Sequence, residues 1–140
     1  MEIAKYIAAA AAGYLLGSVS ASVLLSKLAF RRDVRAEGSG NAGATNVARV
    51  FGMWAGIATL LADVGKTVLA ILLGQWLAGD MGLCIAGIAC ILGHCWPMYF
   101  HFRGGKGVSV GAAIGMMIDW RVFVIIFIVF FVTFALCQIV

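Results

Sequence analysis

Long apolar segments, separated by short polar stretches, constrain this chain more than any other feature. Residues 6–28, 51–79 and 122–140 are long and apolar, as an α-helix must be to cross a hydrocarbon core of about 30 Å at about 1.5 Å per residue. Hydrophobic residues make up 64% of the chain and charged residues 11%, whereas about a quarter of a soluble domain is charged. We therefore expect an all-α integral membrane protein.

About five transmembrane helices are predicted from the order of the apolar segments. Asp63 and Lys66 interrupt the second segment, which favours one tilted or broken helix there. Asp80 marks a turn, Pro97 ends the returning helix, and residues 119–121 mark a further turn. The predicted spans are residues 6–28, 51–79, 81–98, 108–118 and 122–140.

Small residues recur at helical spacing along the first predicted span. Gly13 and Gly17 accompany Ser18, Ser22 and Ser26. This pattern favours close packing of the helix against a neighbour. The alternative is a path lined by hydroxyl groups.

Positively charged residues gather around two of the predicted loops. They are Lys27, Arg31, Arg32, Arg35 and Arg49 around the first loop, and Arg103 and Lys106 in the second. Because cations accumulate in cytoplasmic loops, both loops are predicted to face the cytoplasm. Near the N-terminus Lys5 is opposed by Glu2, so the N-terminus is predicted to lie outside.

The first loop carries the stretch GSGNAGATNVAR, residues 38–49. Its glycine spacing fits a dinucleotide fingerprint, but that motif requires a preceding strand, and here a basic loop precedes it. Glycines, short polar side chains and a following helix N-terminus together favour an anion site. The predicted phosphate-binding residues are Ser39, Gly40, Asn41, Gly43, Thr45 and Asn46, with Arg49 one helical turn beyond Thr45.

The second loop, RGGKG, places two cations around a glycine pair. These residues are Arg103, Gly104, Gly105 and Lys106. Arginine offers a planar fork to phosphate oxygens and lysine a point charge. A surface that attracts anionic lipid headgroups is the competing interpretation, but the surrounding glycines and asparagines favour a specific phosphate site shared by the two loops.

Three ionisable side chains fall inside apolar segments. Asp63 and Lys66 lie three residues apart on one helix face, which suits either a structural ion pair or a pair in which Asp63 holds Lys66 toward a phosphate. His94 suits either a hydrogen-bonded structural role or that of a general base. His94 and Cys90 share a helix face, but two candidate ligands do not make a metal site, and none is predicted.

These motifs together resemble the bacterial acyl-phosphate:glycerol-3-phosphate acyltransferases, the PlsY family of small integral membrane enzymes. The resemblance rests on GSGNAGATNVAR, on the D-x-x-K element formed by Asp63 and Lys66, and on LGHCWPMYFHFRGGKGVSV at residues 92–110. Thr67 stands where the family usually has glycine. The similarity extends over essentially all 140 residues.

The resemblance implies the first part of a seven-helix fold. Family members are longer, and they carry a third motif of serine, histidine, asparagine and glutamate residues after the point where this sequence stops. We therefore expect residues 1–140 to form a single membrane domain that is shortened at its C-terminus. A homo-oligomer or a second, completing chain would then supply the missing part.

The resemblance also implies an activity, in the bacterial plasma membrane with the active site facing the cytoplasm. A fatty acyl group would pass from acyl phosphate to the 1-hydroxyl of glycerol 3-phosphate, giving lysophosphatidic acid and phosphate. Arg49, Lys106 and Lys66 are the expected catalytic residues, with Asp63, His94 and Arg103 in support. The expected partners are these substrates and membrane lipids, without nucleic acid, cofactor or metal.

Two other functions stay open. A broken helix with polar residues at mid-membrane is typical of carriers, which here would move phosphate or a phosphorylated metabolite. The absent third motif also suits an inactive subunit that binds acyl phosphate without turnover.

Overall fold

The computed structural model describes residues 2–137, and within that range every regular element is helical. The all-α prediction is thereby confirmed. The elements are α1 (Glu2–Gly17), α2 (Ala21–Phe30), the 3-10 helix η1 (Val34–Ala36), α3 (Ala44–Phe51), α4 (Met53–Cys95), the 3-10 helix η2 (Met98–Phe100), α5 (Val108–Ile118) and α6 (Trp120–Cys137).

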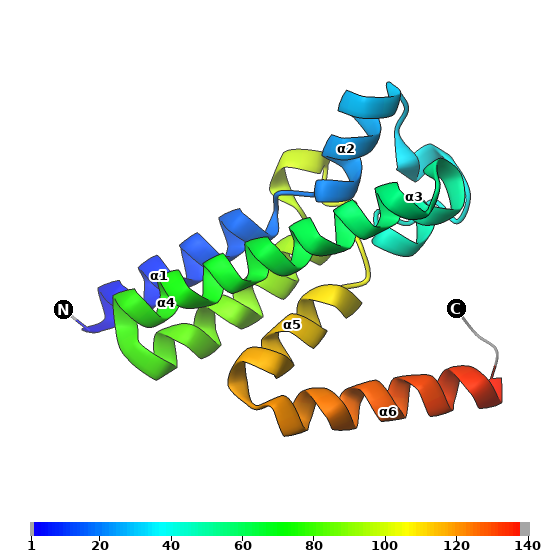
Figure 1. Ribbon diagram of the computed structural model, residues 1–140. Helices are drawn as coiled ribbons and strands as arrows, with labels where there is room; N and C mark the ends of the chain where they lie inside the picture. The colour runs from blue at the N-terminus through cyan, green and yellow to red at the C-terminus, as the bar shows by residue number, and fades with distance from the viewer. Residues whose placement is uncertain (1, 138–140) are drawn as a thin grey trace.

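The long element α4 is a hairpin of two helices rather than one rod. Ala78 (φ −146°, ψ 26°) and Gly79 (φ 63°, ψ −152°) leave the helical conformation, and the chain reverses there (Figure 1). The positive φ at Gly79 favours a residue without a Cβ. Close to the bend, Gly74 and Gly82 approach so closely that a Cβ on either would overlap the backbone of the other. The predicted turn at Asp80 is therefore found one residue earlier.

Helix α1 lies along the α4 hairpin (Figure 1) and packs against it through small residues. A Cβ on Gly13 would overlap the backbone of Ala86, and one on Gly17 would overlap the backbone of Cys90. Such close approach of two backbones is how helices associate in lipid. The small-residue interpretation of the first span is thus confirmed for its glycines.

The first predicted span, residues 6–28, falls within an apolar segment long enough to cross a membrane, Glu2–Phe30, but two helices share it. Helix α1 ends at Gly17 and α2 begins at Ala21, because side chains from elsewhere satisfy the backbone where the helix breaks. The Lys66 ammonium donates to the carbonyls of Gly17 (3.1 Å) and Val19 (2.7 Å). In lipid a break of this kind is tolerated only with such partners.

The last two described helices are α5 and α6. Helix α5 packs against α4, and α6 follows it and stands farther from the α1–α4 body (Figure 1). Helix α5 has the predicted bounds, whereas α6 begins two residues earlier than expected, because the Asp119 carboxylate accepts the Arg121 N–H at 2.8 Å and caps the helix. Residues 138–140 of the predicted last span lie outside the described residues.

Three segments are long and apolar enough to cross a membrane: Glu2–Phe30, Met53–Phe100 and Trp120–Cys137. Helix α5 is apolar but shorter. Five spans result if the α4 hairpin counts as two and α5 as one. That count, and the orientation of the helices, stay predictions.

Candidate active site

The first loop is organised around the buried side chain of Asn46. Its Nδ2 lies 3.1 Å from the Val34 carbonyl, 3.0 Å from the Glu37 carbonyl and 3.1 Å from the Asn41 carbonyl. Its Oδ1 accepts the Ser39 N–H at 2.9 Å. Because both ends of the amide are engaged in this way, Asn46 holds the loop in shape and has little capacity left for a ligand.

A Cβ on Gly38 would overlap Oδ1 of Asn46, and Gly38 also has a φ of +55°. The next turn repeats this requirement, since Gly40 has a φ of +72°. These are conformations that glycine adopts without the steric cost that other residues meet. Gly38 and Gly40 therefore shape the loop that Asn46 ties together.

Arg35 joins the two loops. Its Nη1 donates to the carbonyls of Phe100 (2.7 Å) and Arg103 (3.3 Å) in the second loop. Its Nε and Nη2 donate to Asp33 at 3.0 and 2.8 Å. These hydrogen bonds from Arg35 hold the pKa of the Asp33 carboxyl well below its usual range, and Asp33 in turn raises the pKa of Arg35.

The glycines of the second loop allow it to lie directly on the end of α4. The Gly104 N–H donates to the Cys95 carbonyl (3.2 Å) and the Gly105 N–H to the His94 carbonyl (3.1 Å). A Cβ on Gly104 would overlap the His94 carbonyl oxygen. Both N–H groups are thus used within the protein, so these glycines place the neighbouring Lys106 rather than offer donors of their own.

Several exposed cations next to the loops have no ion-pair partner among residues 2–137, and two of them stand at predicted catalytic positions. Arg49, on α3, and Lys106 are both exposed, and neither forms an ion pair with a carboxylate among residues 2–137. The Arg49 guanidinium makes one long contact, 3.4 Å, with Asn46 Oδ1. Unpaired cations beside polar loops are suited to an anionic ligand.

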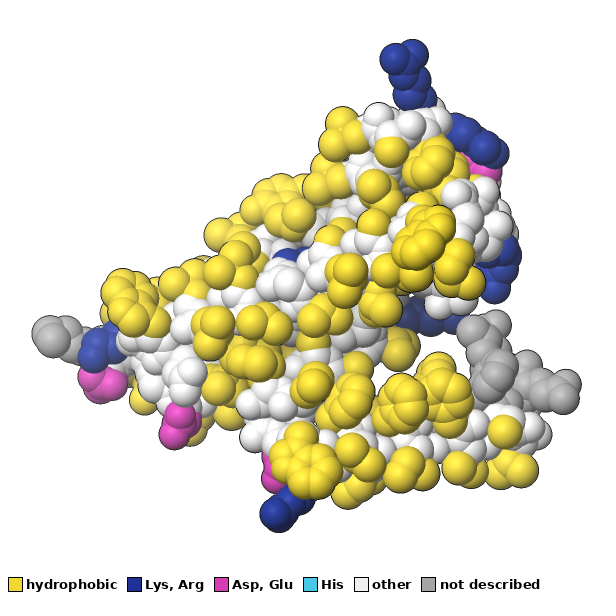
Figure 2. All heavy atoms as spheres, in the orientation of Figure 1, with side chains coloured by type: hydrophobic (Ala, Val, Ile, Leu, Met, Phe, Trp, Pro, Cys, Tyr) yellow, Lys and Arg dark blue, Asp and Glu magenta, His cyan; other side chains and the backbone are white. Residues whose placement is uncertain are grey.

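These two cations open onto a cavity of about 670 Å³. Its polar end is formed by Ser39, Asn41, Gly43, Thr45, Asn46, Arg49, His94, Lys106 and Ser109. Its walls are apolar and come mainly from α4, α5 and α6, with Leu60, Leu61, Val64, Ala112, Ala113, Met116, Phe123, Ile126, Phe127, Phe130 and Phe131. A hollow between α6 and the rest of the molecule is visible in Figure 2. The cavity is therefore amphipathic, with positive charge at one end only.

Lys66 does not line this cavity. Its ammonium donates to the carbonyls of Gly17 and Val19 and lies 3.0 Å from Nδ1 of His94, which accounts for its three hydrogens. Asp63 Oδ1 lies 2.9 Å from the same Nζ as an ion-pair partner. The structural interpretation of the Asp63 and Lys66 pair therefore fits better than one in which Lys66 faces a phosphate.

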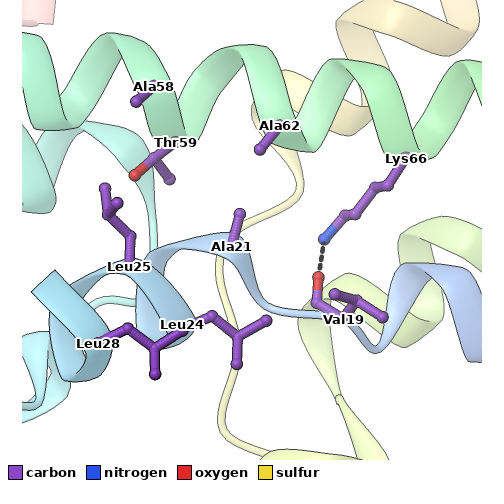
Figure 3. A pocket seen from close by; sticks show the side chains of 9 residues that line it. All are labelled: Val19, Ala21, Leu24, Leu25, Leu28, Ala58, Thr59, Ala62 and Lys66. Atoms are coloured by element: carbon purple, nitrogen blue, oxygen red, sulfur yellow. Dashed lines mark hydrogen bonds between the residues drawn. The ribbon is translucent and has the colours of Figure 1, made fainter.

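Lys66 instead borders a separate apolar groove of about 370 Å³ between α2 and α4. Figure 3 shows it at one end of this groove, donating to the Val19 carbonyl, with the leucines of α2 farther along the groove.

The structure thus brings together most, but not all, of the predicted site residues. Ser39, Asn41, Gly43, Thr45, Asn46, Arg49, His94 and Lys106 line one cavity. Gly40, Asp63, Lys66, Arg103, Gly104 and Gly105 do not line it. Among the described residues no group of three or more His, Cys, Asp or Glu side chains could hold a metal ion.

Sequence reasoning missed two contributors. One is Arg35, which was counted only as a loop charge; its neighbour two residues back, Asp33, was the available signal. The other is the aromatic wall from α6, of which Phe123 and Phe127 recur at helical spacing and lie with ring centroids 5.8 Å apart. Nothing local in the sequence indicates that this helix faces the polar loops.

Comparison with known proteins connects this geometry to one family. The family model described as "Glycerol-3-phosphate acyltransferase" matches residues 7–140. A protein of that name from Pseudomonas paraeruginosa is 53% identical over 106 residues, which cover 75% of this chain and 55% of the relative. Another from Shouchella clausii is 51% identical over 115 residues, 80% of this chain and 56% of the relative. The chain spans about half the length of the curated relatives it matches.

Solved structures agree with the sequence comparison. The crystal structure of PlsY described as "an integral membrane glycerol 3-phosphate acyltransferase", in its glycerol 3-phosphate form, superposes with a TM-score of 0.82 at 32% identity, covering 93% of this chain and 66% of that one. The lysophosphatidic acid form gives a TM-score of 0.78 at 30% identity, covering 92% and 64%. With its sequence and its fold matching in this way, the chain belongs to the glycerol-3-phosphate acyltransferase family of integral membrane proteins.

Proposed function

We propose that this chain acts in the transfer of a fatty acyl group from acyl phosphate to the 1-hydroxyl of glycerol 3-phosphate, giving lysophosphatidic acid and phosphate. The observation that carries the proposal is the amphipathic cavity, in which two unpaired cations, Arg49 and Lys106, open onto apolar walls. An acyl phosphate has the same two parts, an anionic head and an alkyl chain. Membership of the family supports the same reaction.

The chemistry needs orientation and charge compensation more than an enzyme nucleophile. The hydroxyl oxygen of glycerol 3-phosphate attacks the acyl carbonyl carbon, the bond from that carbon to the phosphate oxygen breaks, and the departing phosphate takes the hydroxyl proton. Orienting two reactants can contribute about 7 to 11 kcal/mol. Preorganised cations stabilise the negative charge that develops.

The residues divide between holding the ligands and holding the site. Arg49 and Lys106 neutralise the phosphate groups, and Ser39, Asn41 and Thr45 supply further polar contacts at the same end of the cavity. Gly43 precedes α3 as its N-terminal cap residue, so that the helix begins at the cavity. Asn46, Gly40, Gly104 and Gly105 shape the two loops, and Arg103 contributes its backbone carbonyl to the bond with Arg35.

The apolar walls would receive the acyl chain. Helix α6 contributes most of the aromatic surface of the cavity, and most of its described side chains are exposed. Burial of each methylene contributes about 0.8 kcal/mol, so a long alkyl chain gains affinity from this wall that a short one lacks. The proposed donor is therefore a long-chain acyl phosphate.

The proposed setting is the bacterial plasma membrane, with both loops facing the cytoplasm. The cations Lys27, Arg31 and Arg32 at the end of α2 support this orientation through the positive-inside rule. Figure 2 shows basic side chains gathered at the end of the molecule that holds α2 and α3. A water-soluble acceptor such as glycerol 3-phosphate would then enter from the cytoplasm. We also propose that the chain acts as a homo-oligomer or together with a second chain.

A carrier for phosphate is less well supported than a transferase. The carrier was suggested by the pair Asp63 and Lys66 inside an apolar segment. These two groups bind each other, and Lys66 also binds His94 and two backbone carbonyls at the break after α1. They are thus not available for a transported ion. An inactive acyl-phosphate-binding subunit makes use of the same cavity and differs from an enzyme only in turnover.

The experiment is to reconstitute the purified chain in lipid with palmitoyl phosphate and glycerol 3-phosphate, and to follow phosphate and lysophosphatidic acid together. Equal release of both products supports the transferase. Binding of palmitoyl phosphate without either product would replace it with the binding subunit. Accumulation of labelled phosphate inside proteoliposomes, without acyl transfer, would replace it with the carrier.

A further inference from the structure

His94 occupies the boundary between the charged cluster and the cavity. Its side chain is 4% exposed, and it lines the cavity that holds Arg49 and Lys106. On its other side, Nδ1 lies 3.0 Å from the Lys66 ammonium and 3.6 Å from Asp63 Oδ1. The two ring nitrogens therefore have different surroundings.

The lysine determines which nitrogen carries the proton. An ammonium group donates hydrogen bonds and accepts none, so Nδ1 can bind Lys66 only as an acceptor. In a neutral imidazole the proton is then on Nε2. The carboxylate of Asp63, 2.9 Å from Nζ, is the ion-pair partner of this ammonium, and separating the buried pair would leave an uncompensated charge.

The only side-chain hydrogen bond of His94 within residues 2–137 is made by Nδ1, so Nε2 has no partner there. Gly105 lies directly against it, and a Cβ at that position would overlap Nε2. The absence of a side chain at residue 105 leaves the Nε2–H group accessible. Because His94 lines the cavity, a ligand atom in the cavity is the natural acceptor for this donor.

We infer that His94 donates a hydrogen bond from Nε2 to an anionic oxygen of the phosphate ligand in this cavity, and that Lys66 is the positioning residue that fixes the histidine in this form. The identity of the ligand rests on the function proposed above. The inference removes His94 as a general base, because its cavity-facing nitrogen already carries a proton. It also gives Lys66 an effect on the site without contact with the ligand.

The tautomer can be read by nuclear magnetic resonance. The chain contains two histidines, His94 and His101, so His101→Gln leaves one set of ring nitrogen signals. Long-range correlations between the carbon-bound ring hydrogens and the two ring nitrogens then show which nitrogen is protonated. We expect the proton on Nε2, with Nδ1 unprotonated. A proton on Nδ1, or on both nitrogens, would overturn the inference.

Removing the lysine tests its positioning role. In Lys66→Met the acceptor Asp63 Oδ1 remains 3.6 Å from Nδ1, so we expect the proton to move to Nδ1. Lys5→Met, an exposed lysine paired with Glu2, is the matched control and should leave the spectrum unchanged. An Nε2–H form that persists in a folded Lys66→Met protein would refute the role of Lys66; if that variant does not fold, the wild-type spectrum still decides the tautomer.

Titration with inorganic phosphate tests the donor role. We expect the Nε2 signal to shift together with the backbone amides of Ser39 and Lys106, and His94→Leu to weaken phosphate binding about tenfold, as expected for loss of a hydrogen bond to a charged group. His94→Gln, whose amide can donate from a similar position, should recover part of that loss. Shifts at Ser39 and Lys106 without one at His94 would end this inference and leave the proposed function standing. No shift at any of the three would count against the proposed phosphate site itself.

Discussion

Replacement of Asn46 by aspartate should open the first loop while leaving the rest of the fold intact. The two side chains have nearly the same shape, but aspartate puts an oxygen where Nδ2 donates. Three backbone carbonyls, those of Val34, Glu37 and Asn41, lie 3.0 to 3.1 Å from that atom. In Asn46→Asp these three carbonyls would face a negatively charged acceptor instead of a donor.

The size of the effect follows from the number of bonds lost. Nδ2 carries two hydrogens, so at most two of the three contacts form at once. A net loss of about 1 kcal/mol for each bond, with a further cost for carbonyls left buried and unsatisfied, gives about 2 to 4 kcal/mol. This corresponds to a roughly 30- to 700-fold increase in the equilibrium constant for opening the loop.

Amide hydrogen exchange measures this opening locally. The informative amides are those of Ser39, which donates to Asn46 Oδ1 at 2.9 Å, and of Gly40, which donates to the Glu37 carbonyl at 2.9 Å. Both should exchange faster by the stated factor in Asn46→Asp. Amides in residues 80–95, on the second helix of the α4 hairpin, should keep their protection.

Asn41→Asp is the matched control, because it makes the same chemical change in the same loop. The Asn41 side chain has no hydrogen bond to the described part of the chain, so the loop should stay closed. If Asn46→Asp and Asn41→Asp exchange at the same rate as the wild type, the reasoning that makes Asn46 the centre of the loop is refuted.

Three further predictions concern the cations, the helix contacts and the loop junction. Arg49→Ala and Lys106→Ala should each lower kcat/KM for acyl transfer by about 10²- to 10³-fold, the usual cost of removing one charge-stabilising group. Arg103 is exposed in the same loop as Lys106 but lies outside the cavity, so Arg103→Ala should leave kcat/KM unchanged. Unchanged turnover in Arg49→Ala and Lys106→Ala would contradict the proposed charge compensation. Gly93→Ala would place a Cβ against the Tyr14 carbonyl and should destabilise the protein by about 1 to 3 kcal/mol. Gly65 has nothing within 4 Å of an added Cβ, so Gly65→Ala should stabilise α4 by up to about 1 kcal/mol. Equal free energies of unfolding for the two variants would argue against the close contact of α1 with Gly93. Arg35 lowers the pKa of Asp33 in the folded protein, so the folded state binds fewer protons than the unfolded state. The pair therefore stabilises the fold fully above the ordinary carboxyl pKa, and this contribution is lost as pH falls below about 4. The free energy of unfolding, measured between about pH 5 and pH 2.5, should depend on pH less steeply in Asp33→Asn than in the wild type, and identical slopes would refute this prediction.

Those parts of the fold that depend on local sequence could be predicted. The bend of α4 follows from the Gly79 and Asp80 pair between two apolar runs, and the bounds of α5 follow from Gly107 and Asp119 on either side. Gly13 and Gly17 indicated a close helix contact without naming the partner. In each case neighbouring residues determine the structure, so their order along the chain carries the information.

The parts that depend on distant partners could not be predicted in the same way. The break after Gly17 requires Lys66, which is 49 residues away in the sequence. Asn46 makes five contacts, with backbone and side-chain atoms that only folding brings together. Since the sequence does not reveal these partners, its amide was interpreted as one that binds a ligand. Lys66 was taken for a catalytic residue for the same reason: a buried lysine indicates a strong interaction but not the identity of its partner.

The bond between Lys66 and the broken first helix bears on the order in which the protein assembles. The segment that contains Gly17 and Val19 precedes α4 in the chain and emerges first during synthesis, so the ammonium that binds their carbonyls is not yet beside them. Unsatisfied carbonyls are expensive in hydrocarbon, so the nascent segment is more stable as one straight helix. The break between α1 and α2 then forms when α4 arrives, which makes the shape of the first loop a product of late membrane assembly rather than of insertion.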